Sequence, residues 1–138
     1  MSYRDLDLWN EAVELAVETF NIARILPYRE RRDIADQMRR ASVSVSSNVA
    51  ESTGRSGPAD QFQFAVRARA SLAELDTQVE ICRRLQWLTA EADDALQTRI
   101  RSVRRLLSGL IRYYDKRRQQ SVQTRGRGSS RETSKREG

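Results

Sequence analysis

Apolar residues recur at steps of three and four positions between Trp9 and Tyr114, and this spacing constrains the fold more than any other feature of the sequence. Such spacing places apolar side chains on one face of an α-helix. The alternation at Val43 and Val45 resembles a strand, but the helical pattern continues on both sides of it. The clearest run has the spacing of a heptad and consists of Ala65, Ala68, Leu72, Leu75, Val79 and Cys82.

Three further stretches carry an apolar seam of the same kind. The first consists of Trp9, Ala12, Val13, Ala16, Phe20 and Ala23. The second consists of Ile34, Met38, Ala41, Val45 and Val49. The last consists of Leu96, Ile100, Val103, Leu107, Leu110 and Tyr114. The sequence therefore predicts four amphipathic helices and no strands.

Residues that start or stop helices divide the pattern. Helix one is expected from about Leu8 to Leu26, with Asp5 or Asp7 as its cap and Pro27 after it. Helix two is expected to start near Arg29, to run as far as Thr53 and to be capped by Gly54. Helix three opens at Pro58 and ends near Leu85, and helix four follows Thr89, a good N-cap.

Four such helices joined by short loops predict an all-α, antiparallel up-down-up-down four-helix bundle over residues 1–118. From Gln119 the sequence is rich in glycine, serine, threonine and arginine, with Val122 its only aliphatic residue. This composition predicts a disordered tail over residues 119–138. Residues 118–138 hold six basic and two acidic residues, so they supply four of the six net positive charges.

Missing residue types narrow the chemistry. The chain has no histidine and one cysteine, so it lacks the commonest general base and cannot build a structural zinc site alone. No glycine-rich phosphate loop follows a strand. We therefore expect no enzymatic activity, no catalytic residues, no cofactor and no metal. A single cysteine, no apolar run long enough for a membrane span and no signal peptide favour a cytoplasmic protein without membrane contact.

Basic side chains form the first candidate site. Arg101, Arg104, Arg105, Arg112 and Lys116 lie away from the seam of helix four, at spacings that can align them for phosphate contacts. Arg39 and Arg40 of helix two are candidates to extend this surface. A solvated helix face explains the same pattern, and the sequence does not decide between the two interpretations.

A polar set forms the second candidate site. The segment from Ser44 to Arg55 is unusually rich in small and polar residues, which is typical of a close helix–helix junction. Its Asn48 and Glu51, with Glu74 and Gln78 of helix three, are predicted to form a hydrogen-bonded network that fixes helix register or a subunit junction. Metal ligation by the glutamates is the disfavoured alternative, because carboxylate bundle sites use Glu-x-x-His pairs.

Several segments match a known family. They are Asp5–Leu6–Asp7–Leu8–Trp9, Gln37 to Val45, Asn48–Val49–Ala50–Glu51 with Gly54–Arg55, Ser71 to Gln78, and Leu107 with Gly109–Leu110–Ile111. In this order and spacing the chain resembles the bacterial 23S rRNA intervening-sequence, or S23-type, proteins. These are related to the accessory variability protein of diversity-generating retroelements. Ser52 departs from the pattern, since the family usually has glycine there, and the tail lies outside the resemblance.

The resemblance implies a four-helix bundle that assembles into a homopentamer. It also implies RNA or DNA as a partner, and a reverse transcriptase where the gene lies in a retroelement. We therefore expect a non-enzymatic homo-oligomeric accessory or scaffold protein that associates with RNA through basic surfaces. The alternative is a structural or protein-interaction module with no direct role in nucleic-acid binding. The sequence does not name the RNA, the protein partner or the biological process.

Overall fold

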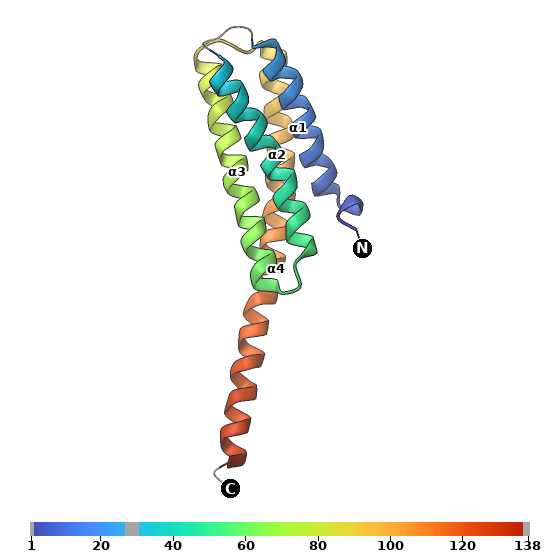
Figure 1. The fold of residues 1–138 in the computed structure, drawn as a ribbon, viewed down its shortest axis with the longest axis vertical. Coiled ribbons are helices and arrows are strands. Elements are labelled where there is room, and N and C mark those ends of the chain that lie inside the picture. The colour runs from blue at the N-terminus through green and yellow to red at the C-terminus, as the bar shows by residue number, and fades with distance from the viewer. Residues whose placement is uncertain (1, 27–30, 137–138) are drawn as a thin grey trace.

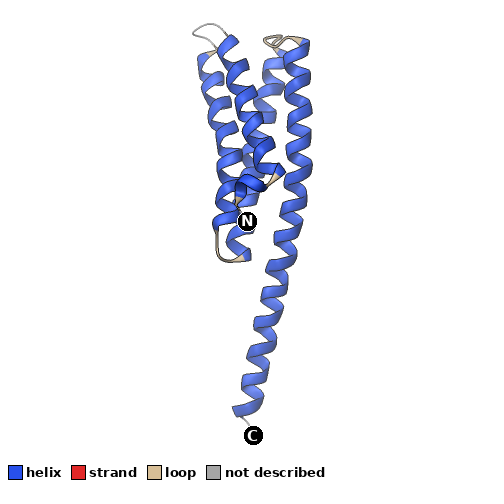
Figure 2. Cartoon of the chain, turned by 90° about the vertical axis from the view of Figure 1, so that its right-hand side faces the viewer, coloured by secondary structure: helices blue, strands red, loops and turns tan. Residues whose placement is uncertain are grey.

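The computed structural model describes residues 2–26 and 31–136 of the 138-residue chain. Its elements are a short 3-10 helix η1 (Tyr3–Asp5) and the helices α1 (Asp7–Ile25), α2 (Arg32–Gly54), α3 (Pro58–Arg84) and α4 (Ala90–Arg136). Figure 2 shows that the described residues contain helices and loops but no strand. The predicted all-α class is confirmed.

The four helices run alternately up and down and surround one core (Figure 1). Each helix packs on two neighbours, so that α1 contacts α2 and α4, and α3 contacts the same two helices. The contact between α1 and α4 closes the ring. This arrangement is the up-down-up-down bundle that four amphipathic helices with short connections favour.

The core confirms most of the predicted seams and corrects two of them. The seam of α3 from Ala65 to Cys82 is fully buried, as are Met38, Val45 and Val49 of α2. In α1 the buried positions are instead Leu8, Ala12, Leu15, Thr19 and Ala23, whereas Phe20 is 43% exposed. In α4 Ile111 is buried, while Leu110 lies at the edge of the core. Both stripes are wide, so periodicity alone leaves their rotation undetermined by about one residue.

The helix ends follow the predictions in part. The Thr89 hydroxyl accepts a hydrogen bond from the backbone N–H of Ala92 (3.1 Å), which confirms it as the cap of α4. Gly54 is the last residue of α2 and has no positive φ angle, so the expected left-handed cap is wrong there. Asp5 belongs to the capping box of η1, and α1 starts without a side-chain cap. Pro27 and Arg29, the expected stop and start signals, lie outside the described residues.

Helix α4 continues beyond the bundle as a single projecting helix (Figures 1 and 2). Residues 119–127 are exposed apart from the half-buried Ser121. The described side chains beyond residue 118 therefore have little packing on the bundle, although helix α4 continues to Arg136. A segment without a packed face is consistent with the predicted tail. A helix without a packed face is marginal in water, so this extension is stabilised only by its own local bonds.

Helices α2 and α3 meet at the close junction that the small residues predicted. Ala41, Ser42 and Ser52 of α2 are buried, as are Ala65 and Ala68 of α3. Side chains of this size let two helix backbones approach closely. Ser52, where the family usually has glycine, fits because its hydroxyl donates to the carbonyl oxygen of Val49 (2.6 Å) and leaves no buried donor unpaired.

Candidate nucleic-acid interface

Four of the predicted basic residues share the face of α4 that points away from the bundle. Arg101, Arg105, Arg112 and Lys116 follow one another at steps of four, seven and four positions, and each is exposed. None of them forms an ion pair with any residue that the structure describes. We call these four residues the outer cationic face.

The other three predicted basic residues lie elsewhere. Arg104 points toward α3 and forms an ion pair with Asp76 (2.8 Å). Arg39 pairs with Asp36 on its own helix (2.9 Å), and Arg40 is exposed on α2. Helix α2 does not neighbour α4 in the bundle, so Arg39 and Arg40 do not extend the outer cationic face.

The predicted polar network is only partly assembled. The Asn48 amide donates to the backbone oxygen (2.8 Å) and the hydroxyl (3.0 Å) of Ser44, whose hydroxyl also bonds that of Ser71 on α3 (2.8 Å). Glu51 instead pairs with Arg55 (3.0 Å). Asn48 is thus connected across the junction through the hydroxyls of Ser44 and Ser71, and not through glutamates. The sequence alone did not indicate that these two hydroxyls would bond.

Glu74 and Gln78 belong to a different surface. Glu74 is exposed on α3, and Gln78 is half-buried one helical turn later. The buried Oε1 atom of Gln78 has no hydrogen-bond partner among the described residues. Ile81 (43% exposed) and Leu85 (51% exposed) continue this line of positions along α3. We call these four residues the α3 stripe.

An ion-pair cluster that the sequence did not reveal joins α1 to α4. Arg99 donates to Glu11 (2.8 Å) and to Glu18 (2.9 Å), and the Ser102 hydroxyl bonds the same oxygen of Glu11 (3.3 Å). Hydrogen bonding to Arg99 holds the pKa of Glu11 below its ordinary value, and both carboxylates raise the pKa of Arg99. The sequence did not indicate this cluster, because only the fold brings Arg99 to Glu11 and Glu18.

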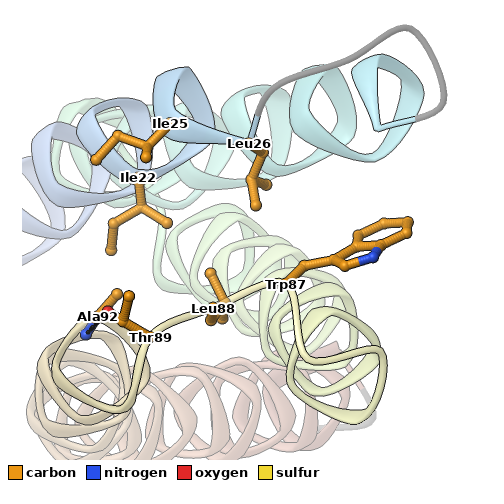
Figure 3. Close-up of a pocket in the computed structure, with 7 residues that line it drawn as sticks. All are labelled: Ile22, Ile25, Leu26, Trp87, Leu88, Thr89 and Ala92. Atoms are coloured by element: carbon orange, nitrogen blue, oxygen red, sulfur yellow. Dashed lines mark hydrogen bonds between the residues drawn. The ribbon is translucent and has the colours of Figure 1, made fainter.

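Two other features carry no chemistry of their own. At the opposite end of the bundle from the α4 extension, a pocket of about 70 Å³ lies between α1 and the α3–α4 loop (Figure 3). Its walls are mostly apolar, as Ile22, Leu26 and Trp87 illustrate, and its volume is about that of two water molecules. The thiol of Cys82 is fully buried, and burial raises its pKa, as expected for a small core residue rather than a nucleophile.

The described residues contain no group of three or more cysteine and carboxylate side chains placed to hold a metal ion. Among the described helices, none combines the length and the apolar character needed to cross a bilayer.

Fold and surface together define an all-α four-helix bundle with an arginine-rich outward face. A family model described as "23S rRNA-intervening sequence protein" matches residues 4–109, and the chain belongs to that family. The expected resemblance is thereby confirmed. The matched region includes Arg101 and Arg105 and ends before Arg112, Lys116 and the extension of α4.

A solved structure supports the same fold. It is a protein of unknown function from the S23 ribosomal protein family of Bacteroides thetaiotaomicron. The match has a TM-score of 0.69 at 19% sequence identity and covers 75% of this chain and 97% of the other. At this identity the likeness establishes the fold alone. Comparison with curated proteins found no match.

Proposed function

We propose that this protein is a non-enzymatic, homo-oligomeric scaffold that associates with RNA through the outer cationic face. The observation that carries the proposal is the contrast among the arginines of α4. Arg99 and Arg104, which point toward neighbouring helices, form ion pairs across the bundle. Arg101, Arg105 and Arg112, which point outward, have no ion pair among the described residues and keep their guanidinium groups available for phosphates.

A surface of this kind acts through charge and not through base recognition. Phosphate contacts release counterions, so affinity falls steeply as salt rises. Four cations on one chain form a weak site. Several copies in one assembly would bind a long RNA much more tightly, because each later contact is intramolecular.

The test is a titration of a structured RNA at several salt concentrations with the full chain. The variant R101A/R105A/R112A is compared with R24A/R32A/R69A, which removes the same charge from exposed arginines on other helices. The first variant should lower the slope of log affinity against log salt by about 2, as expected for three lost phosphate contacts at roughly 0.7 each. Equal effects of the two variants on the salt slope would mean that net charge alone accounts for RNA binding, and this would overturn the proposed site.

The α3 stripe supports the oligomeric part of the proposal. Ile81 and Leu85 expose apolar surface beside Gln78, whose buried amide oxygen has no partner among the described residues. A helix from a second copy, packed along this stripe, would cover the apolar surface of Ile81 and Leu85. We propose a homopentamer, the assembly that family membership implies.

Light scattering on the full chain tests the assembly. A pentamer has five times the 15.9 kDa mass of the chain. Ile81→Lys should dissociate it and leave the helical circular dichroism unchanged, since the side chain lies outside the core. Gln63→Lys, at an exposed position on the same helix, serves as the control. A monomeric wild-type protein would refute the assembly and leave the RNA test unaffected.

The second candidate function is a protein-interaction module without a role in RNA binding. It is favoured by a separate apolar surface on the α1–α2 side, where Val17 is 49% and Val43 is 44% exposed. An intact oligomer that retains no RNA at low salt would select this function over the first.

A further inference from the structure

A second group of arginines surrounds the end of the bundle from which α4 projects, and here each guanidinium lies over an aromatic ring. The guanidinium of Arg118 is 4.2 Å from the ring centre of Phe62. Those of Arg55 and Arg67 are 4.3 Å and 4.6 Å from the ring centre of Phe64. On α4, the guanidinium of Arg117 is 5.6 Å from the ring centre of Tyr113. We call these four arginines and three rings the arginine–aromatic pole.

The pole combines the α2–α3 connection and the start of α3 with a segment of α4 that is distant in sequence. Arg55 directly follows α2, the two phenylalanines lie in the first two turns of α3, and Arg117 and Arg118 lie where α4 leaves the bundle. Phe62 and Phe64 point to opposite flanks of α3. The two phenylalanine stacks are therefore separated by roughly the 10–12 Å diameter of a helix. The sequence did not predict this group, because Phe62 and Phe64 lie outside the apolar seam of α3.

The rings orient the guanidinium groups without enclosing them. Phe62 and Phe64 are half-buried, whereas the side chains of Arg55 and Arg118 are 44% and 42% exposed. Arg55 pairs with Glu51 and Arg118 with Asp115, while Arg67 and Arg117 form no ion pair with the described residues. Each of these arginines approaches a ring on one side and leaves part of its side chain exposed to solvent.

We infer that the arginine–aromatic pole binds single-stranded RNA by stacking unpaired bases on these guanidinium planes. The inference rests on the proposed function for its choice of nucleic acid and adds the strand type and a site distinct from the outer cationic face. Unpaired bases stack on arginine planes and on aromatic rings, and this stacking tolerates any base sequence. Bases inside a duplex are already stacked on one another, so a duplex offers the pole only its phosphates.

The charge near the pole favours the same ligand. Between Asp115 and Glu132 the chain has no acidic residue, and it carries six basic ones: Lys116, Arg117, Arg118, Arg125, Arg127 and Arg131. A strand whose bases stack at the pole would have its phosphates within the positive field of this segment. An acidic peptide would satisfy the charge but would leave the guanidinium planes unused.

Arginine-to-lysine replacement separates stacking from charge. We would titrate the full chain and the variant R55K/R67K/R118K with a fluorescent twelve-residue oligouridylate and with a twelve-base-pair RNA duplex. The control variant R24K/R32K/R69K carries the same substitutions at exposed positions outside the pole and the outer cationic face. The pole variant should bind the single strand about tenfold more weakly, since one base stack is worth about 1–3 kcal/mol. Its duplex affinity and the control should change less than about twofold, because lysine keeps the charge.

Crosslinking of the unmodified protein gives a measurement that does not depend on a variant folding. Oligouridylate containing 4-thiouridine should crosslink to peptides that contain Phe62, Phe64 or Tyr113. Equal losses for single strand and duplex, or crosslinks confined to residues 101–112, would overturn this inference and leave the proposed function standing. Failure of the wild-type protein to bind either RNA at low salt would overturn both.

Discussion

At the scale of the single residue, Gln86 has a backbone that the sequence did not predict. Its φ angle is 60°, and it is the one non-glycine residue with positive φ in the described part of the chain. It directly follows Leu85 at the end of α3, and the next residue, Trp87, donates its N–H to the carbonyl oxygen of Cys82 (2.9 Å). Helices commonly end on such a left-handed residue, usually glycine.

Gln86→Gly should therefore stabilise the protein. A left-handed backbone costs a residue with a Cβ about 1–2 kcal/mol, and glycine avoids this cost. Glycine also raises the conformational entropy of the unfolded chain, which offsets part of the stabilisation. We expect the free energy of unfolding to rise by about 0.5–1 kcal/mol. Chemical denaturation measures the change, and Gln86→Ala, which keeps the Cβ, should give no increase. A lower denaturation midpoint for the glycine variant would contradict the interpretation that the backbone of Gln86 is strained.

Asn48 gives the second prediction at this scale. Its amide bonds both oxygens of Ser44 and so holds the hydroxyl that meets Ser71 across the α2–α3 junction. Asn48→Leu should change the oligomer mass or the melting temperature more than the helical circular dichroism, because the helices themselves do not depend on this bond. Asn21→Leu, on the exposed side of α1, is the control. Unchanged mass and melting for Asn48→Leu would refute a role in assembly or register.

Single positions also show what sequence could reveal about the site. Arg101, Arg105, Arg112 and Lys116 were found because helical spacing alone determines which residues share a face. The ion pair of Arg104 with Asp76 was not found, because it depends on how α4 is rotated against α3. For the same reason Phe20 was placed in the core, although the buried residue at that turn of α1 is Thr19.

At the scale of the element, the contact between α1 and α4 includes the ion-pair cluster of Arg99. Arg99 bridges two carboxylates on α1 that lie seven residues apart, Glu11 and Glu18. The lowered pKa of Glu11 means that the folded state holds this proton less tightly than the unfolded chain does. Its contribution to stability is therefore present above the ordinary glutamate pKa of 4.5 and is lost as pH falls through the lower folded pKa.

Arg99→Met should reduce this acid sensitivity. Methionine keeps much of the apolar stem but cannot donate to either glutamate. At pH 7 we expect a loss of about 1 kcal/mol, typical of partly exposed ion pairs, and a loss that shrinks as pH falls below about 4. Denaturation at a series of pH values measures both. Arg39→Met, which breaks a pair within α2, should cost less. A pH-independent loss would mean that Arg99 acts through packing.

Helix ends separate local signals from signals that depend on the fold. Pro58 opens α3 and Thr89 caps α4 as predicted, because both act within one turn of their own residue. Gly54 was expected to adopt a left-handed cap, yet the chain leaves α2 through an extended Arg55. Arg55 then reaches the ring of Phe64, so packing at this end of the bundle accompanies the exit path.

At the scale of the whole molecule, the bundle follows from four seams and three short connections, which is why sequence predicted it. The sequence is less informative about which side chains from different helices meet on the surface. The arginine–aromatic pole needs the middle of α4 to lie beside the end of α2 and the start of α3, and no local pattern contains that information. The α4 extension is the reverse case. Its composition alone predicted a segment without a packed core, and the described side chains of residues 119–127 are exposed or, at Ser121, half-buried.

Removal of residues 119–138 tests how far the extension is independent of the bundle. The shortened chain keeps Arg118 over Phe62, and the described side chains of residues 119–127 are exposed or, at Ser121, half-buried. The melting temperature should therefore change by less than about 2 °C, corresponding to about 0.5 kcal/mol for a domain of this size. Under the proposed function the positive charge of the extension adds phosphate contacts, so its removal should lower the salt slope of RNA binding.

These two readouts distinguish three roles for the extension. An unchanged melt with a lower salt slope identifies it as an accessory cationic arm on a self-sufficient bundle. An unchanged melt with an unchanged slope would confine RNA binding to the bundle and leave the arm without a role in it. A large drop in melting temperature at low protein concentration, reversed at high concentration, would show that the projecting helix packs between copies. The scaffold would then be built partly by α4, and its cations would be shared between assembly and RNA.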